Sequence, residues 1–174
     1  MVYNDKKDFA EGKKMKNAVV FYSMSGNTKS IAQRISEQTG ADLIELKPKK
    51  AYPDKGIKKF LWGGKSAVMG EKPELEAYDF NAELYDGIIF GFPVWASSFT
   101  PPIRTFIEEN PSVKQKKISA FACMSGSGAN KAFEKLKAAL GVTSFENELI
   151  LIDPKDKPSE ENEKAIEQFI SSLG

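Results

Sequence analysis

The chain has 174 residues, of which 41% are hydrophobic and 28% charged, and its formal net charge is +1. Its length and apolar content suit one globular domain with a substantial core. The balanced charge gives no field that would indicate a nucleic-acid partner. Histidine is absent, which excludes Ser-His-Asp catalysis and removes the commonest metal ligand, so no catalytic residue and no metal site are assigned.

The lone cysteine and the absence of a long apolar window indicate the cellular setting. Cys123 cannot form an internal disulfide and suits a reducing compartment. No window approaches the roughly 20 apolar residues of a membrane span. We therefore expect a cytoplasmic protein without a membrane partner. Residues 1–14 are charged and lack an apolar period, so they are expected to be a disordered extension or a tag, with residues 15–174 as a single domain.

Five short apolar runs predict β-strands in chain order. They lie at 18–22, 41–46, 87–92, 118–123 and 148–152. The runs are almost continuously apolar instead of alternating, which is typical of a parallel sheet covered on both faces.

Helical patterns follow the strands. Ile31 and Ile35 share one helix face, and Gly40 closes that helix; a second helix starts at the Pro-Pro pair of 101–102. A third ends at Gly141, and Ser159 caps a last one. Strands that alternate with helices predict an α/β fold, a doubly wound three-layer sandwich around a five-stranded parallel sheet.

The stretch 47–86 is too long for an ordinary connection between the second and third strands. We expect it to hold a helix and an excursion, and a lid is one hypothesis. Between positions 41 and 72, eight lysines stand against four acidic residues. These lysines would either attract a phosphorylated nicotinamide or an acidic protein, or simply form a solvated loop.

The segment "SMSGNT" (23–28) joins the first strand to the first helix. In open parallel sheets ligands bind beyond the carboxyl ends of the strands, which is where this loop lies. Its hydroxyls, its glycine and the free N–H groups of a helix start make a nest for a phosphate dianion. The alternative is a well-capped turn. Neither nucleotide-binding glycine motif, G-x-x-x-x-G-K-[ST] or G-x-G-x-x-G, is present here.

Two segments resemble the flavodoxin family. "FYSMSGNTKSIAQRI" is similar to the phosphate loop and first helix of flavodoxins, and "YDGIIFGFPVWASSFTPPIRTF" to the third strand and flavin loop of flavodoxin-like proteins. The resemblance covers about residues 15–174. It implies a strand order of 2-1-3-4-5 and FMN as the cofactor. It also implies that the ribityl phosphate is held by Ser23, Met24 through its backbone, Ser25, Gly26, Asn27 and Thr28.

The resemblance places the flavin ring between two further loops. After the third strand the implied residues are Pro93, Val94, Trp95, Ala96 and Ser97, and after the fourth strand they are Met124, Ser125, Gly126, Ser127 and Gly128. Trp95 would stack on the ring or anchor the loop to the body. Ser125 or Ser127 would donate to flavin carbonyls, or the second loop would only cap the next helix. Cys123 is expected to be an inert buried thiol.

The chain departs from electron-carrying flavodoxins in two respects. It has no tyrosine in the loop after the fourth strand, and its surface is not strongly acidic. An open flavin face would give a nicotinamide or quinone room to stack. The implied function is an FMN-binding redox protein, either an electron carrier with a protein redox partner or a small NAD(P)H- or quinone-linked reductase, as a monomer or a dimer.

The alternative function keeps the fold without the flavin. The protein would then be an interaction or regulatory module, with exposed Trp62 and Phe99 and the lysine-rich stretch as its docking surface.

Overall fold

A computed structural model of the chain describes residues 14–53 and 56–174, with the side chains of 56–61 left undescribed. The expected N-terminal extension therefore lies outside the described residues, apart from Lys14. None of the described helices has both the length and the apolar character needed to cross a bilayer.

The strands form one parallel sheet of order β2-β1-β3-β4-β5. Their bounds are β1 (Asn17–Phe21), β2 (Asp42–Glu45), β3 (Gly87–Pro93), β4 (Lys117–Met124) and β5 (Glu148–Ile152). The predicted fold class and strand order are confirmed, and each predicted strand agrees with the observed one to within one residue at either end.

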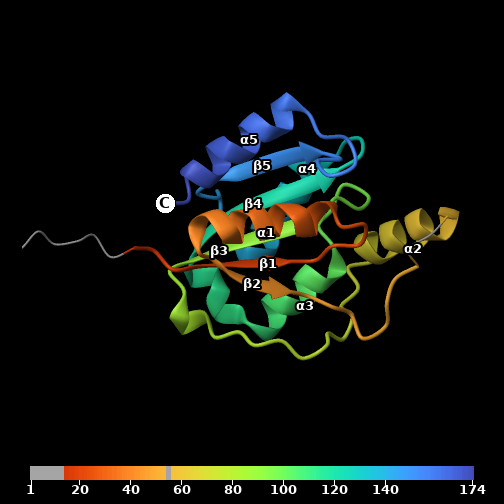
Figure 1. The fold of residues 1–174 in the computed structure, drawn as a ribbon. Helices are drawn as coiled ribbons and strands as arrows, with labels where there is room; N and C mark the ends of the chain where they lie inside the picture. The colour runs from red at the N-terminus through yellow and green to blue at the C-terminus, as the bar shows by residue number, and fades with distance from the viewer. Residues whose placement is uncertain (1–13, 54–55) are drawn as a thin grey trace, which may run out of the picture.

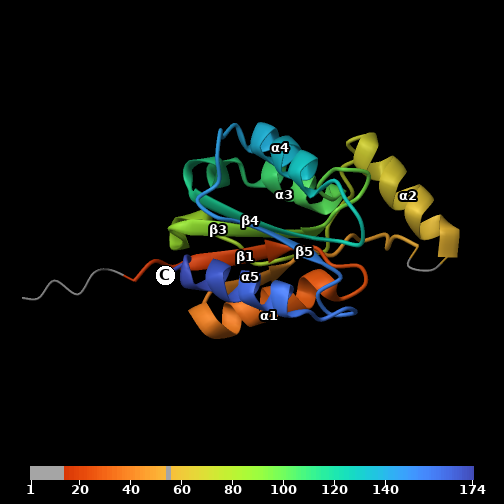
Figure 2. The same cartoon turned by 90° about the horizontal axis from the view of Figure 1, so that it is seen from above.

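Helices cover both faces of this sheet. They are α1 (Asn27–Thr39), α2 (Gly56–Val68), α3 (Pro101–Glu109), α4 (Ala129–Leu140) and α5 (Glu160–Ser171), with short 3-10 turns at Ala82–Leu84 and Pro111–Gln115. In Figure 2, α3 and α4 lie on one face of the sheet, and α1 and α5 lie on the other. The helix ends agree with the sequence: Gly40 and Gly141 follow α1 and α4, and the Ser159 hydroxyl accepts the N–H of Asn162 at the start of α5.

The sheet separates two hydrophobic clusters. Successive residues of a strand point to opposite faces, so Ala18 and Val20 of β1 pack with Phe106 of α3, whereas Val19 and Phe21 join the α1–α5 side. All four β1 residues are almost completely buried. Burial on both faces explains why the strands read as continuous apolar runs.

Helix α2 stands outside this three-layer body. It lies beyond the carboxyl ends of the strands (Figure 1), within the long connection between β2 and β3. The returning chain is fastened to the body where Thr105 Oγ1 donates to the carbonyl of Pro73. The predicted helix and excursion are therefore present, and they lie at the edge of the sheet where ligands bind.

Gly91 in β3 leaves room for an aromatic ring of the neighbouring strand. A Cβ added there would lie 2.2 Å from Cζ of Phe121 on β4, a distance that no side chain tolerates. The Phe121 ring is itself completely buried. It therefore packs directly over the strand backbone at Gly91.

Gly91→Ala should lower the free energy of unfolding by about 1–3 kcal/mol, the usual cost of overpacking a core. The control is Gly126→Ala, where an added Cβ meets no atom within 4 Å. Urea denaturation of both variants measures the difference, and equal stabilities would contradict this packing account.

Candidate functional site

A pocket of about 320 Å³ lies at the carboxyl ends of the central strands. It is located where β1 and β3 lead to connections on opposite sides of the sheet, the usual ligand position in this architecture. Nine of the predicted site residues line it: Met24, Ser25, Asn27, Pro93, Val94, Trp95, Ala96, Met124 and Ser125. The other lining residues are Gly63, Gly64, Cys123 and Asp153. The three predicted loops therefore meet at one cavity.

The β1–α1 loop presents the start of a helix to this pocket. Ser23 Oγ accepts the N–H groups of Gly26 at 3.2 Å and Lys29 at 3.1 Å. Gly26 has a φ of 93°, a conformation that glycine adopts without strain. Asn27 and Thr28 begin α1, so their N–H groups have no acceptor within the helix. The loop thus offers backbone donors at the positive end of a helix dipole.

The side chains of Asn27 and Thr28 are committed to the protein itself. Thr28 is 1% exposed, and its hydroxyl hydrogen-bonds the Cys123 thiol. Burial raises the pKa of that thiol to about 12, so it stays protonated, as expected of an inert cysteine. The Asn27 amide bonds to the loop after β5. Their backbone N–H groups are therefore the donors that they still offer for the predicted phosphate binding.

The β3–α3 loop contains a tight turn with unusual backbone angles. Trp95 and Ser98 exchange backbone hydrogen bonds of 2.9 and 3.0 Å. The central residues Ala96 and Ser97 have φ values of 48° and 55°, which fits the I′ turn geometry. Non-glycine residues in this region cost about 1 kcal/mol or more each. The fold therefore holds this pocket wall in a strained conformation.

Trp95 is fixed by other aromatic rings. Its ring meets Tyr22 edge-on at 5.6 Å and Tyr52 at 5.2 Å between centroids. On another side it approaches Gly63 of α2, where an added Cβ would lie 3.1 Å from the ring. Trp95 therefore anchors the loop and also lines the pocket, so both of its expected roles are open to it.

The β4–α4 loop approaches the β3–α3 loop closely. Gly128 has a φ of 105°, and a Cβ there would lie 2.5 Å from the Ser97 hydroxyl. Ser125 donates its hydroxyl to Asp153 at 2.7 Å, so that hydroxyl is not free to serve a flavin carbonyl as predicted. Gly126, Ser127 and Gly128 do not line the pocket.

Asp153 is a site residue that the sequence reasoning missed. It directly follows β5, has a φ of 40° and is 9% exposed. The hydrogen bond from Ser125 and the ion pair with Lys157 at 3.0 Å lower the pKa of its carboxyl group. The pocket therefore contains one carboxylate held in its ionised form. Its position after a parallel strand was the available sequence signal.

Phe99 does not belong to an exposed docking surface. It is 1% exposed, covered by the Arg104 guanidinium at 4.6 Å and packed near Phe92. Trp62, by contrast, is 52% exposed. The expectation of an exposed Phe99 was wrong because α3 docks over this ring.

Gly63→Ala should weaken flavin binding about fivefold, because the methyl group forces Trp95 or α2 to shift, at a cost of about 1 kcal/mol. Gly64→Ala is the matched control, since its Cβ would lie at an ordinary 3.7 Å from Ala96. Fluorescence titration with FMN compares them. Unchanged affinity in Gly63→Ala would mean that the position of Trp95 does not matter to the ligand.

The chain is similar in fold to solved structures that are described as flavoproteins. A flavoprotein from Lactobacillus acidophilus NCFM, crystallised in complex with FMN, matches 82% of this chain and 95% of its own at 21% identity and a TM-score of 0.67. A protein from Bacteroides eggerthii DSM 20697 assigned as a flavoprotein matches 91% of this chain and 98% of its own at 22% identity and a TM-score of 0.71. Identities this low show a common fold.

Comparison at the level of sequence gives the family. No curated protein shows significant similarity to the chain. A family model described as Flavodoxin matches residues 16–165, which span the sheet, the pocket loops and the first half of α5. The chain belongs to the flavodoxin family.

Proposed function

We propose that this protein binds FMN in the pocket at the carboxyl ends of β1, β3 and β4 and acts as a flavin-dependent redox protein. The observation that carries the proposal is the meeting of a phosphate-type loop and an aromatic wall in one cavity. FMN is the cofactor indicated by flavodoxin membership and by the FMN complex of the Lactobacillus acidophilus flavoprotein.

The donor groups of the pocket fit such a cofactor. The N–H groups of Asn27 and Thr28 at the start of α1, with the Ser25 hydroxyl beside them, match a phosphate dianion. Pro93, Val94 and Trp95 offer an apolar wall to a planar ring. Polar groups at one end and apolar groups at the other suit a ligand with a charged tail and an aromatic head.

FMN supplies one- and two-electron chemistry when it is bound, and the chain supplies binding and electrostatics. The rings of Tyr22 and Tyr52 pack against Trp95. Burial raises the pKa of both phenols, that of Tyr52 to about 12, so both side chains stay neutral. No histidine exists to move protons. Trp95 and the two tyrosines would therefore position the flavin ring without acting as general acids or bases.

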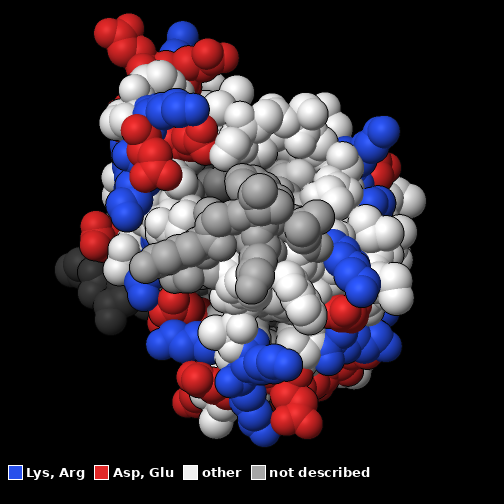
Figure 3. Space-filling model, turned by 90° about the vertical axis from the view of Figure 1, so that its right-hand side faces the viewer, with Lys and Arg blue, Asp and Glu red and all other residues white. Residues whose placement is uncertain are grey.

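Between carrier and reductase, the β4–α4 loop favours a reductase. Ser125, Gly126 and Ser127 are exposed and carry no aromatic ring that would cover the ligand. Figure 3 shows Lys and Arg side chains mixed with Asp and Glu side chains around the rim of the face at the carboxyl ends of the strands. Such a mixed surface gives less steering toward a single charged protein partner than a strongly acidic one. A nicotinamide or a quinone is the proposed electron-exchange substrate.

The flavin-free interaction module is the second candidate. It loses Phe99 from its docking surface and keeps Trp62. Lys49 and Lys72, two members of the lysine-rich stretch, are paired with Glu74 and Glu108. The surface left for such a partner is smaller than the sequence suggested.

The visible absorption spectrum of freshly purified protein tests the proposal, before and after incubation with FMN and desalting. One retained FMN per chain is the expected result. Steady NADH or NADPH oxidation with a quinone acceptor would then identify a reductase. A protein that stays colourless after incubation would favour the interaction module.

Ser25→Ala should weaken FMN about tenfold and leave riboflavin unchanged, because only FMN carries the phosphate and hydrogen bonds to charged groups contribute about 1.5–3 kcal/mol. Ser25 is exposed, so the substitution should not disturb the core. Titration with both ligands measures the ratio. An equal loss for both would contradict a phosphate contact.

Asp153→Asn should raise the midpoint potential of the bound flavin by about 40 mV, which corresponds to about 1 kcal/mol for one electron. A nearby negative charge disfavours reduction, and the amide still accepts the Ser125 hydroxyl. Asp79→Asn, an exposed residue outside the pocket lining, is the charge-matched control. Potentiometric titration decides, and identical potentials would place Asp153 too far from the ring to matter.

A further inference from the structure

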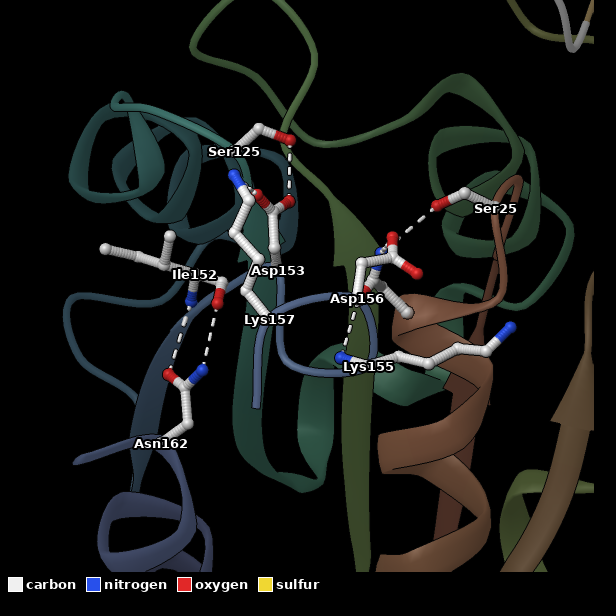
Figure 4. Close-up of polar contacts among 9 residues, drawn as sticks. Ser25, Ser125, Ile152, Asp153, Lys155, Asp156, Lys157 and Asn162 are labelled. Carbon is white, nitrogen blue, oxygen red and sulfur yellow. Dashed lines mark hydrogen bonds and ion pairs between the residues drawn. The ribbon is translucent and has the colours of Figure 1, made fainter. Parts of the chain in front are cut away.

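The loop after β5, residues 153–159, lies against the phosphate loop (Figure 4). Two bonds of 2.8 Å join them: Asn27 Oδ1 accepts the backbone N–H of Lys155, and Asn27 Nδ2 donates to Oδ2 of Asp156. Asn27 is only 8% exposed. The oxygen and the nitrogen of its side-chain amide therefore both join the phosphate loop to the loop after β5. A third, longer contact of 3.4 Å runs from Nδ2 to Ser25 Oγ.

Lys155 extends along the start of α1. A Cβ added at Gly26 would lie 3.0 Å from Nζ of Lys155, so the ammonium group rests on the turn of the phosphate loop. Among the described residues Lys155 forms no ion pair within 4 Å, whereas Lys29, in the first turn of α1, is paired with Glu45. A positive charge that has no ion-pair partner among the described side chains thus lies beside the helix start that is proposed to receive a dianion.

The same loop reaches the pocket with its first residue. Asp153 lines the cavity, and the backbone N–H of Asp153 donates to the carbonyl of Met124. The loop is fastened at both ends, because the Asn162 amide pairs with the N–H and carbonyl of Ile152 just before it. Its residues are therefore held at the site by several independent contacts.

We propose that residues 153–157 are a fourth binding element of the FMN site, beside the three loops of the flavodoxin pattern. Asn27 is a positioning residue that latches this element to the phosphate loop, and Lys155 supplies positive charge to the phosphate. The inference rests on the proposed FMN binding. Asp156 brings an opposing charge, so the Lys155 contribution is a moderate one.

The latch is tested by exchanging its two side chains. In Asn27→Asp two carboxylates face each other where a 2.8 Å hydrogen bond stood, which should lower the melting temperature and weaken FMN about tenfold. Asp156→Asn alone should change little. The double variant Asn27→Asp/Asp156→Asn restores the donor on the opposite partner, so melting temperature and FMN affinity should both return toward the original values.

The double variant separates a latch from a phosphate ligand. If the Asn27 amide contacts the phosphate directly, a carboxylate at position 27 keeps FMN binding weak even when Asp156 is replaced, and the positioning role is overturned. A melting temperature restored without the affinity would equally overturn the positioning role, because the loop would then stabilise the fold without serving the ligand. The melting temperatures need no flavin, so they test the latch even if the chain binds none.

Lys155→Gln tests the charge. It should weaken FMN about fivefold at low ionic strength, with the difference fading as salt is added, and leave riboflavin unchanged. Lys164→Gln, an exposed residue of α5, removes the same charge away from the site and should have no effect. Equal losses in the two variants, or an equal loss of FMN and riboflavin, would overturn the role of Lys155. A wild-type chain that binds neither ligand would refute the proposed function itself.

Discussion

The parallel arrangement of the five strands is the constraint on which the site depends. In a parallel sheet all carboxyl ends lie at one edge, so every loop that leads from a strand into a helix must begin there. The order β2-β1-β3-β4-β5 sends the chain to opposite sides after β1 and β3. This divergence leaves a gap between the adjacent loops, and the N–H groups at the start of α1 lie beside that gap.

The loops around this gap support each other in a closed ring. The phosphate loop is joined to the β5–α5 loop through Asn27, and that loop to the β4–α4 loop through the bond from Ser125 to Asp153. The ring closes where Gly128 meets Ser97 and where Trp95 meets Tyr22. The described non-glycine residues with positive φ, Ala96, Ser97 and Asp153, all lie in this ring. Strain at a ligand site persists when surrounding contacts over-determine it.

The sequence predicted the sheet and three of the four loops because their signals are local. Continuous apolar runs mark buried parallel strands, and "SMSGNT" carries its donors within six residues. The Asn27–Asp156 bond spans 129 positions and joins a side-chain amide to a carboxylate, and no local pattern encodes the meeting of these two groups. The burial of Phe99 and the approach of Gly63 to Trp95 likewise arise only when a helix docks.

Helix α2 lies in the connection between β2 and β3, which meets the ring through side-chain packing, with Tyr52 against Tyr22 and Trp95. It touches the pocket through Gly63 and Gly64, yet Val68 at its end and Met69 just after it remain largely exposed. Residues could therefore be inserted between β2 and β3 without breaking any hydrogen bond of the other four loops, whereas one added residue in those loops would shift a link. Divergence in chain length is expected to accumulate in this connection while the ring keeps its dimensions.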